Sequence, residues 1–350
     1  MTRVALLGFG TVGSAVARRL TSPDAPSSLS LTHVLDRRAE SKRAQFQPSA
    51  RFTWTSSIAE ILDSDADVVV EALGGLDPAA EWVRAALERG KSVVTANKQL
   101  VARQGWTLWK LAARQGRQLR FEAAVGGAMP IIRTIADGLA GDRVTRITAI
   151  LNGTTNTVLS AIDDRGCSVG EAIVEAQTRG LAERDPAADI DGRDAGAKLA
   201  ILCGLAFGLR IAPEDIPTRS ASSVTPEDFA TARQRGGTIR QLAHAEYDRA
   251  RRSLTARVAP EFVGAETIFA RAIGPQNAAL IAAEHCGEIG ISGVGAGGDA
   301  TAVAIVGDLL AIARDRAAIV PAPVLIADFT FDFAFDFSLS TFNFPLAEAV

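Results

Sequence analysis

The sequence predicts an α/β protein whose first domain is a doubly wound parallel sheet and whose second domain is α+β. Short strand-like and helix-like patterns alternate through the first third of the chain, as crossover connections between parallel strands require. A glycine-rich turn follows the first strand. The alternation ends near Ile131, and a chain of 350 residues exceeds the ~250 residues that one core usually holds.

The predicted strands of the first domain are short, apolar runs. They cover residues 4–7, 29–35, 68–72, 92–95 and 119–123. Helix-like stretches lie between them, most clearly at residues 78–89, where Gly90 is a stop signal, and at residues 106–114. This order predicts parallel strands that are joined by helices.

The glycine string after the first strand reads Gly-Phe-Gly-Thr-Val-Gly. Gly8 permits a tight turn, Gly10 lets the backbone approach a pyrophosphate, and Gly13 allows the helix to pack closely on the strand. Thr11 and Val12 open the helix, whose amino terminus offers N–H groups and a positive dipole. A glycine-rich turn without a ligand is the alternative, but the position between strand and helix favours function. We predict an NAD(P)-binding domain of the Rossmann type.

Two signals for the choice of cofactor conflict at the end of the second strand. Asp36 lies 23 residues after Gly13, where a carboxylate accepts hydrogen bonds from the ribose hydroxyls of NAD. Arg37 and Arg38 follow directly, and a guanidinium there binds the 2′-phosphate of NADP. The sequence leaves NAD and NADP open, and we expect NADP to be at least tolerated.

The second half of the chain lacks regular alternation, which predicts an α+β domain. Its helix-like stretches are residues 131–139, 169–178, 195–207 and 226–235, and its strand-like runs are residues 146–151, 254–258 and 278–283. A glycine string at 293–298 and a helix-like stretch at 301–313 suggest a return to the first domain. The predicted domains are a nucleotide-binding domain at 1–130 with 293–316 packing back onto it, a second domain at 131–292, and an atypical tail at 317–350.

Residues 180–198 place five carboxylates ahead of one lysine. Asp194 and Lys198 stand four residues apart and so share one face of the predicted helix. A solvated acidic loop is one explanation, but such a loop does not need Gly180 and Gly192 ahead of an apolar helix. A catalytic segment is the other explanation, and the segment taken alone leaves both open.

Several motifs together resemble the homoserine dehydrogenase family from Met1 to about Arg316. Residues 176–198 match the family signature at every fixed position. The other motifs are GFGTVG at 8–13, EALGG at 71–75, TANK at 95–98, FEAAVGGAMP at 121–130, LNGTTN at 151–156 and GVGAGG at 293–298. The resemblance implies NAD(P)-dependent interconversion of L-homoserine and L-aspartate 4-semialdehyde, in the biosynthesis of threonine, methionine and isoleucine. A different amino-acid dehydrogenase of this fold, or a nonenzymatic dinucleotide sensor, is the alternative.

The resemblance also implies roles for the charged residues. Lys198 is then the proton shuttle, Asp194 orients it or the substrate, and Lys98 lies near the nicotinamide. An alcohol releases hydride easily only as its proton leaves, so the reaction needs such a positioned group. Which lysine moves the proton stays open. Glu183 and Asp189 are expected to bind the substrate ammonium group by charge-assisted hydrogen bonds.

Further glycines and carboxylates complete the expected site. The resemblance assigns Gly74, Gly180 and Gly295 to the cofactor, a role that the lack of a side chain permits. Asp185 and Asp191 are expected to serve turn geometry or solvation instead.

The string at 121–130 resembles the monovalent-cation loop of the same family. There the carboxylate of Glu122 and the backbone carbonyls of Val125, Gly127 and Met129 would surround Na⁺ or K⁺. Hard oxygen donors suit such an ion. A glycine-rich turn without an ion is the alternative.

Composition excludes other kinds of partner. Lys and Arg number 37 against 40 Asp and Glu, so no basic field would hold nucleic acid or an anionic membrane. No apolar run reaches the ~18 residues of a membrane span. The three histidines lack the spacing of zinc ligands. The three cysteines lack a pairing pattern, which predicts buried thiols and a cytoplasmic protein. Separately, the family resemblance implies a homodimer that forms through the second domain.

The end of the chain departs from the family pattern. Phenylalanine alternates with small or acidic residues from Phe329 to Phe337. This period of two predicts either a strand with one aromatic face or a compositionally biased tail, and we favour the biased tail.

Overall fold

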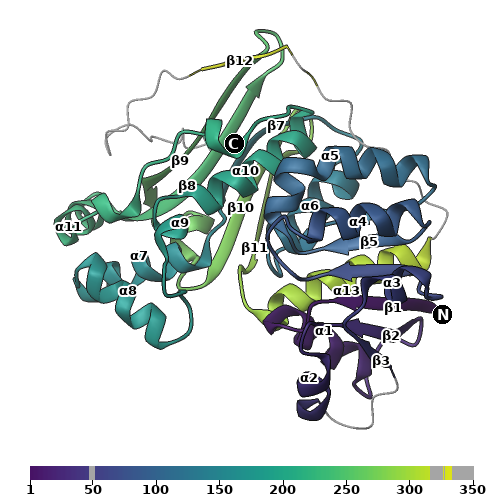
Figure 1. Cartoon of the computed structure of the whole chain (residues 1–350). Coiled ribbons are helices and arrows are strands. Elements are labelled where there is room, and N and C mark those ends of the chain that lie inside the picture. Colours follow the sequence, from purple (N-terminus) through teal and green to yellow (C-terminus); the bar gives the residue numbers. More distant parts are fainter. Residues whose placement is uncertain (47–51, 316–325, 327, 333–350) are drawn as a thin grey trace. The chain divides into compact units, whose positions relative to one another are not determined.

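The computed structural model describes residues 1–46, 52–315, 326 and 328–332. The chain divides into two compact units, one from Met1–Gly138 with Ala296–Leu325 and one from Leu139–Gly295 with Ile326–Val350. Each unit contains its own six-stranded sheet. Figure 1 labels the helices and strands of both.

The first unit is built on a parallel sheet with the strand order β3-β2-β1-β4-β5-β6. The strands are β1 Thr2–Leu7, β2 Leu29–Leu35, β3 Thr53–Thr55, β4 Val68–Glu71, β5 Ser92–Thr95 and β6 Leu119–Arg120. The order reverses beside β1, and nucleotides bind such sheets at the carboxyl ends of the strands next to the reversal. The prediction of a doubly wound Rossmann-type sheet is confirmed.

Helices connect the strands of the first unit, and one more returns to it from late in the chain. They are α1 Thr11–Thr21, α2 Ala39–Gln45, α3 Ile58–Asp63, α4 Ala79–Glu88, α5 Lys98–Arg114, α6 Ile131–Arg133 and α13 Gly298–Arg314. The late helix α13 packs against α1, where Ile305 and Leu309 share an apolar core with Val16 and Leu20. The first unit is therefore assembled from two separate parts of the sequence.

Local hydrogen bonds explain where the predicted elements of this unit were wrong. The strand at 119–123 ends at Arg120, because the next residues turn into a short 3₁₀ helix at Glu122–Ala124. The helix predicted from residue 106 begins at Lys98, because the Asn97 side chain accepts the Leu100 N–H at 3.1 Å and caps it. The helix predicted at 131–139 gives way to a π-helical turn at Thr134–Gly138.

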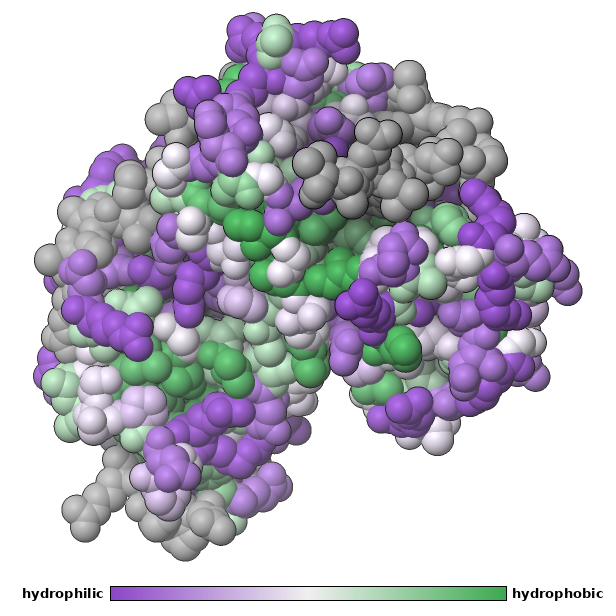
Figure 2. Space-filling view, turned by 180° about the vertical axis from the view of Figure 1, so that it is seen from behind, coloured by the Kyte–Doolittle hydropathy of each residue, from purple (hydrophilic) through white to green (hydrophobic). Residues whose placement is uncertain are grey.

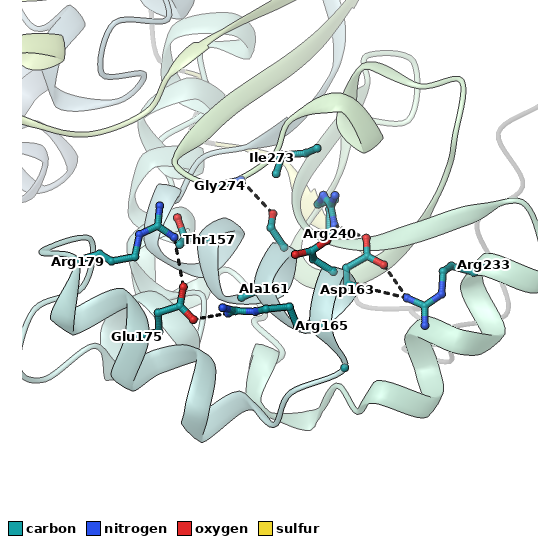
Figure 3. A pocket seen from close by; sticks show the side chains of 13 residues that line it. Thr157, Ala161, Asp163, Arg165, Glu175, Arg179, Arg233, Arg240, Ile273 and Gly274 are labelled. Atoms are coloured by element: carbon teal, nitrogen blue, oxygen red, sulfur yellow. Dashed lines mark hydrogen bonds and ion pairs between the residues drawn. The ribbon is translucent and has the colours of Figure 1, made fainter.

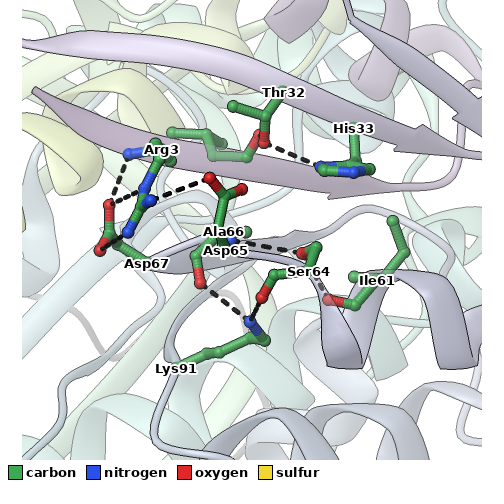
Figure 4. Close-up of polar contacts among 10 residues, drawn as sticks. Arg3, Thr32, His33, Ile61, Ser64, Asp65, Ala66, Asp67 and Lys91 are labelled. Carbon is green, nitrogen blue, oxygen red and sulfur yellow. Dashed lines mark hydrogen bonds and ion pairs between the residues drawn. The ribbon is translucent and has the colours of Figure 1, made fainter.

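A buried lysine fixes the amino-terminal edge of the first sheet (Figure 4). Lys91 is only 6% exposed, and its Nζ donates to the carbonyl oxygens of Ser64 at 2.6 Å and Ala66 at 3.0 Å. Beside it, the Arg3 guanidinium pairs with Asp65 at 2.9 Å and Asp67 at 3.1 Å. These contacts hold the connection between α3 and β4.

The second unit is built on a mixed sheet with the order β11-β10-β7-β8-β9-β12. The strands are β7 Val144–Ile150, β8 Gly237–Asp248, β9 Ser253–Gly264, β10 Gln276–Ala283, β11 Gly287–Val294 and β12 Thr330–Phe331. Neighbouring strands run antiparallel except β12, which runs parallel to β9. The predicted α+β character of this part is confirmed.

The helices of the second unit include several that the sequence did not predict. They are α7 Gly153–Arg165, α8 Val169–Thr178, α9 Ala187–Ile190, α10 Arg193–Phe207, α11 Pro226–Gln234 and α12 Ile268–Arg271. The prediction at 169–178 matches α8, where Ser168 and Glu171 form a capping box. The sequence missed α7, which is rich in threonine, and the long strand β8, whose residues are buried on both faces and so do not alternate.

The three cysteines differ in burial, although the sequence predicted that all three are buried. Cys203 is fully buried, and burial raises the pKa of its thiol. Cys286 is exposed, because it lies in the turn between β10 and β11, where its N–H donates to the Asp142 carboxylate at 2.8 Å. Cys167 is half-buried, so the prediction of three buried thiols is met in full only by Cys203 and is wrong for Cys286.

The described surface carries few large apolar side chains. Hydrophilic residues dominate much of the face in Figure 2, and Val174 and Ile273 are among the exposed large apolar residues. None of the helices in the described ranges has the length and apolarity to span a membrane. In the tail, Thr330–Phe331 pairs with β9, whereas Phe333, Phe335 and Phe337 lie outside the described residues.

Candidate active site

The glycine turn at the end of β1 has the geometry that its sequence predicted. Gly8 has φ +94°, and a Cβ there would lie 2.8 Å from the Ala72 carbonyl oxygen. A Cβ on Gly13 would lie 2.0 Å from the Gly8 carbonyl oxygen, so helix and strand approach too closely for a side chain. Around Gly10 nothing lies within 4 Å of such a Cβ. The turn therefore leaves open space at the position where a pyrophosphate would approach.

Asp36 follows β2, and its carboxylate is already held by the backbone. One oxygen accepts the Phe9 N–H at 3.1 Å, and the other accepts the Arg38 N–H at 2.8 Å. Asp36 is therefore joined to the glycine turn, beside Thr11 and Val12 at the start of α1. The arginine side chains of residues 37 and 38 are exposed.

A buried glutamate joins two further loops at this end of the sheet. Glu71 is fully buried, and its carboxylate accepts the N–H groups of Leu73 at 2.8 Å and Gly74 at 3.2 Å. The Thr95 hydroxyl donates to the same carboxylate, and Asn97 then caps α5, whose first residue is Lys98. This network fixes the position of Lys98 relative to β4 and β5. The motifs at 71–75 and 95–98 contained Glu71 and Asn97, but sequence reasoning gave them no role.

Three other glycines were assigned to the cofactor. Backbone conformation favours glycine at two of them, and lack of space for a side chain requires it at the third. Gly74 has φ +75° and Gly180 has φ +70°, and neither would have a neighbour within 4 Å of an added Cβ. Gly295 belongs to the second unit, where a Cβ would lie 2.2 Å from the Asn277 side chain. Packing within that unit is enough to explain Gly295.

In the second unit, Lys198 and Asp194 form the ion pair that their spacing predicted. The Lys198 Nζ lies 2.8 Å from the Asp194 carboxylate and donates to the Leu151 carbonyl oxygen at 2.7 Å. The Lys198 side chain is 12% exposed and that of Asp194 3% exposed. A pair so shielded from water interacts more strongly than a surface pair.

Asn152 connects this pair to Asp189. Its side-chain amide donates to Asp189 at 2.7 Å and to Asp194 at 2.8 Å, while its carbonyl oxygen accepts the Thr155 N–H at 2.8 Å and caps α7. The Thr155 hydroxyl in turn donates to the Asp189 backbone carbonyl at 2.8 Å. The sequence motif at 151–156 contained both residues, but their polar contacts depend on the fold and could not be read from spacing.

The other carboxylates of the segment behave differently from one another. Glu183 is exposed, and its backbone carbonyl accepts the Gln177 side chain at 3.1 Å. Asp185 accepts the Ala187 N–H at 3.1 Å, and Asp191 accepts the Ser220 hydroxyl at 2.9 Å. The Asp185 contact is a local turn contact of the kind expected, whereas the Asp191 contact joins residues 29 positions apart and holds two segments of the second unit together.

The loop around Glu122 is tight and buried. The Glu122 carboxylate accepts the N–H groups of Ile132 at 2.9 Å and Arg133 at 2.8 Å, and burial, then the neighbouring Asp308, raises the pKa of Glu122 to about 7. Gly127 has φ +63°, and the Met129 carbonyl accepts the Ile131 N–H at 2.8 Å. Within the described ranges, no three or more His, Cys, Asp or Glu side chains are grouped to hold a metal ion. An ion in this loop would therefore depend mainly on backbone carbonyls, such as those of Val125, Gly127 and Met129.

Comparison with known proteins decides the family. Residues 130–310 match the model of the homoserine dehydrogenase family, and residues 8–122 match that of its NAD-binding domain. The chain belongs to the homoserine dehydrogenase family. Homoserine dehydrogenase of Mycobacterium tuberculosis is 40% identical over 319 residues, which cover 89% of this chain and 72% of the relative. That of Bacillus subtilis is 34% identical over 320 residues, covering 89% and 73%.

Solved homoserine dehydrogenases have the same fold. The structure from Thiobacillus denitrificans superposes with a TM-score of 0.86 at 34% identity, over 94% of this chain and 79% of the other. A hyperthermophilic archaeal homoserine dehydrogenase in complex with NADPH superposes with a TM-score of 0.75 at 27% identity, over 90% and 98%. The protein is thus an NAD(P)-dependent oxidoreductase with homoserine dehydrogenase activity.

Proposed function

We propose that this homoserine dehydrogenase interconverts L-homoserine and L-aspartate 4-semialdehyde with Lys198 as the proton shuttle. The observation that carries the assignment is the shielded Lys198–Asp194 pair, held by Asn152. In the reduction direction the Lys198 ammonium group donates a proton to the aldehyde oxygen as negative charge develops there. In oxidation the lysine takes the proton back. When bound, the nicotinamide cofactor supplies or accepts the hydride.

Asp194 and Asp189 have separate tasks in this proposal. Asp194 keeps the Lys198 ammonium group oriented, because its carboxylate contacts Nζ at 2.8 Å. Asp189 and the exposed Glu183 offer carboxylates to the substrate ammonium group. Lys98 stays the second candidate for proton transfer, and its fixed position at the start of α5 supports a role beside the nicotinamide.

For the cofactor we propose that both NADP and NAD are accepted. Asp36 supports NAD through the ribose hydroxyls, whereas the exposed Arg37 and Arg38 support NADP through the 2′-phosphate. Initial rates with each cofactor test this proposal, and an Arg38→Ala variant should lose rate with NADP more than with NAD. An NAD-only enzyme would contradict the role of the arginines.

We also propose that the Glu122 loop binds Na⁺ or K⁺. A buried carboxylate and the carbonyl oxygens of a tight turn are hard donors that fit such an ion. Melting temperatures in Na⁺, K⁺ and a large inert cation at equal ionic strength test it. A Glu122→Gln variant should lose any cation-specific increase, and equal melting temperatures in all three salts would contradict the proposal.

The remaining assignments concern assembly and location. The family resemblance supports a homodimer that forms through the second unit, and the free cysteines support a cytoplasmic protein. Light scattering on the purified chain tests the dimer.

Homoserine oxidation with NADP and NAD tests the function itself, because the sensor alternative predicts cofactor binding without turnover.

A further inference from the structure

A large polar cavity lies in the second unit, and none of the proposed catalytic residues lines it. It has a volume of 930 Å³ and is lined by the later part of α7, by α8, α11 and β8, and by residues just before β10. Binding sites for small molecules typically measure ~300–1,000 Å³. Asn152 and Thr155 belong to the amino-terminal end of α7, whereas the cavity begins at Thr157.

Four arginines line the cavity in two clusters, which Figure 3 shows one beside the other. In the first cluster, Glu175 of α8 pairs with Arg165 and with Arg179, the latter at 3.4 Å. In the second, Asp163 of α7 pairs with Arg233 at 3.0 Å and with Arg240 at 3.6 Å. In each cluster two guanidinium groups share one carboxylate. Each cluster therefore keeps an excess of positive charge.

Arg240 gives the second cluster a donor that the protein does not satisfy. This residue is 2% exposed, and its Nη1 donates to the Thr238 hydroxyl at 3.1 Å and the Ile239 carbonyl at 2.9 Å. Its Nε–H, however, has no hydrogen-bond partner among the described residues. A buried donor without a partner is unfavourable, and an arginine keeps its charge even where burial lowers its pKa, as it does here. An anion that binds this guanidinium would give the Nε–H an acceptor and would balance the buried positive charge.

The charge of the whole lining supports the same conclusion. Among the described residues that line the cavity, four arginines stand against the carboxylates of Asp163, Asp164 and Glu175, so the lining keeps one positive charge in excess. Guanidinium groups bind carboxylate and phosphate by paired, charge-assisted hydrogen bonds. We propose that this cavity binds a small metabolite with two anionic groups, each a carboxylate or a phosphate, one at each arginine cluster.

The proposal is tested by isothermal titration of the full chain at constant ionic strength. The probes are succinate, with two carboxylates, 2-phosphoglycolate, with a phosphate and a carboxylate, and inorganic phosphate, with a single anionic group. We expect saturable binding of succinate or 2-phosphoglycolate, and weaker binding of inorganic phosphate. The stronger of the first two shows which chemistry the natural ligand carries.

Matched variants separate this site from general anion binding. Arg179→Gln and Arg233→Gln each remove one exposed arginine from a different cluster, and each should weaken binding about tenfold or more. Arg251→Gln removes an exposed arginine of the same unit, paired with Asp248 at 3.6 Å outside the cavity, and should leave binding unchanged. Unchanged melting temperatures would show that the variants fold. No saturable binding up to millimolar concentrations, or equal binding in all three variants, would overturn the proposal.

Discussion

Lys198 ends a chain of contacts that runs from Asp189 through Asn152 and Asp194. The spacing of Asp194 and Lys198 was readable from the sequence, because side chains four residues apart share a helix face. Asn152 was not readable, because it lies 42 residues before Asp194 and reaches it only through the fold. Residue-level chemistry was therefore predictable where it is local in sequence and hidden where it is not.

Replacing Lys198 tests its assignment as the proton shuttle. We expect Lys198→Ala to lower kcat about 10²–10⁴-fold, the usual contribution of a positioned acid or base, while affinity for the cofactor persists. Lys110→Ala on the exposed face of α5 is the matched control and should keep normal turnover. Steady-state kinetics and cofactor titration measure both effects. Near-normal turnover in Lys198→Ala would show that another group transfers the proton. Lys98→Ala would then test the second candidate.

Two glycines of the nucleotide turn should respond differently to the same added methyl group. Gly13→Ala would place a Cβ 2.0 Å from the Gly8 carbonyl oxygen, so we expect a lower melting temperature. Gly10→Ala meets nothing within 4 Å and should fold normally, yet it should weaken cofactor binding, because its methyl group points into the space left for the pyrophosphate. Thermal unfolding and fluorescence titration with NADPH separate the two. Equal effects of both substitutions on stability would contradict this interpretation.

At the scale of elements, boundaries were predicted well where the stop signal lies in the sequence. The strands at 29–35 and 92–95 and the helix at 169–178 match the structure. The start of α5 was missed because Asn97 acts as its cap inside a motif that reads as a loop. β8 was missed because burial on both faces removes the period of two.

Replacing Lys91 tests how much one side chain stabilises the connection between α3 and β4. Lys91→Met would leave the carbonyl oxygens of Ser64 and Ala66 without their present donor. We expect the free energy of unfolding to fall by ~1–3 kcal/mol, as measured by denaturant titration. Arg89→Gln removes an exposed pair with Asp63 at the same edge and should change little. Equal stability of Lys91→Met and the parent chain would contradict the structural role.

Burial of His244 should make the free energy of unfolding of the second unit depend on pH. It lies on β8 opposite Thr148 of β7 and Arg257 of β9, and its Nδ1 is 3.0 Å from the Thr148 hydroxyl. Burial, then the charges of Arg257 and Arg146, lowers the pKa of His244 to about 3. Glu246 lies 3.9 Å from its Nε2, but this glutamate is exposed and so offsets the shift little.

The direction of this pH dependence follows from the protons that His244 binds in the folded and in the unfolded chain. Below about pH 6.5 the unfolded chain protonates His244 while the folded chain does not, so the stability it contributes is full above that pH and is lost as the pH falls toward 3. We expect a loss of about 2 kcal/mol by about pH 5. In a His244→Gln variant this part of the pH dependence should vanish in denaturant titrations. An unchanged pH dependence in the variant would show that His244 is protonated in the folded state.

At the scale of the whole molecule, the sequence predicted both fold classes and the family. It did so because the glycine turn, the Asp194–Lys198 signature and the other motifs each reflect a local geometric need. The buried Glu122–Asp308 contact, which joins residues 186 positions apart, could not be read in this way. The arginine-lined cavity was hidden for the same reason, because its charges come from three helices and one strand.

We propose that this chain oxidises homoserine with a nicotinamide cofactor and that Lys198 takes the proton. The most direct measurement is the absorbance of NADPH and NADH formed from L-homoserine by the purified chain, beside Lys198→Ala and Lys110→Ala. We expect turnover in the parent chain and in Lys110→Ala, and its loss in Lys198→Ala with cofactor binding retained. Cofactor binding without turnover in the parent chain would contradict it and favour a dinucleotide sensor.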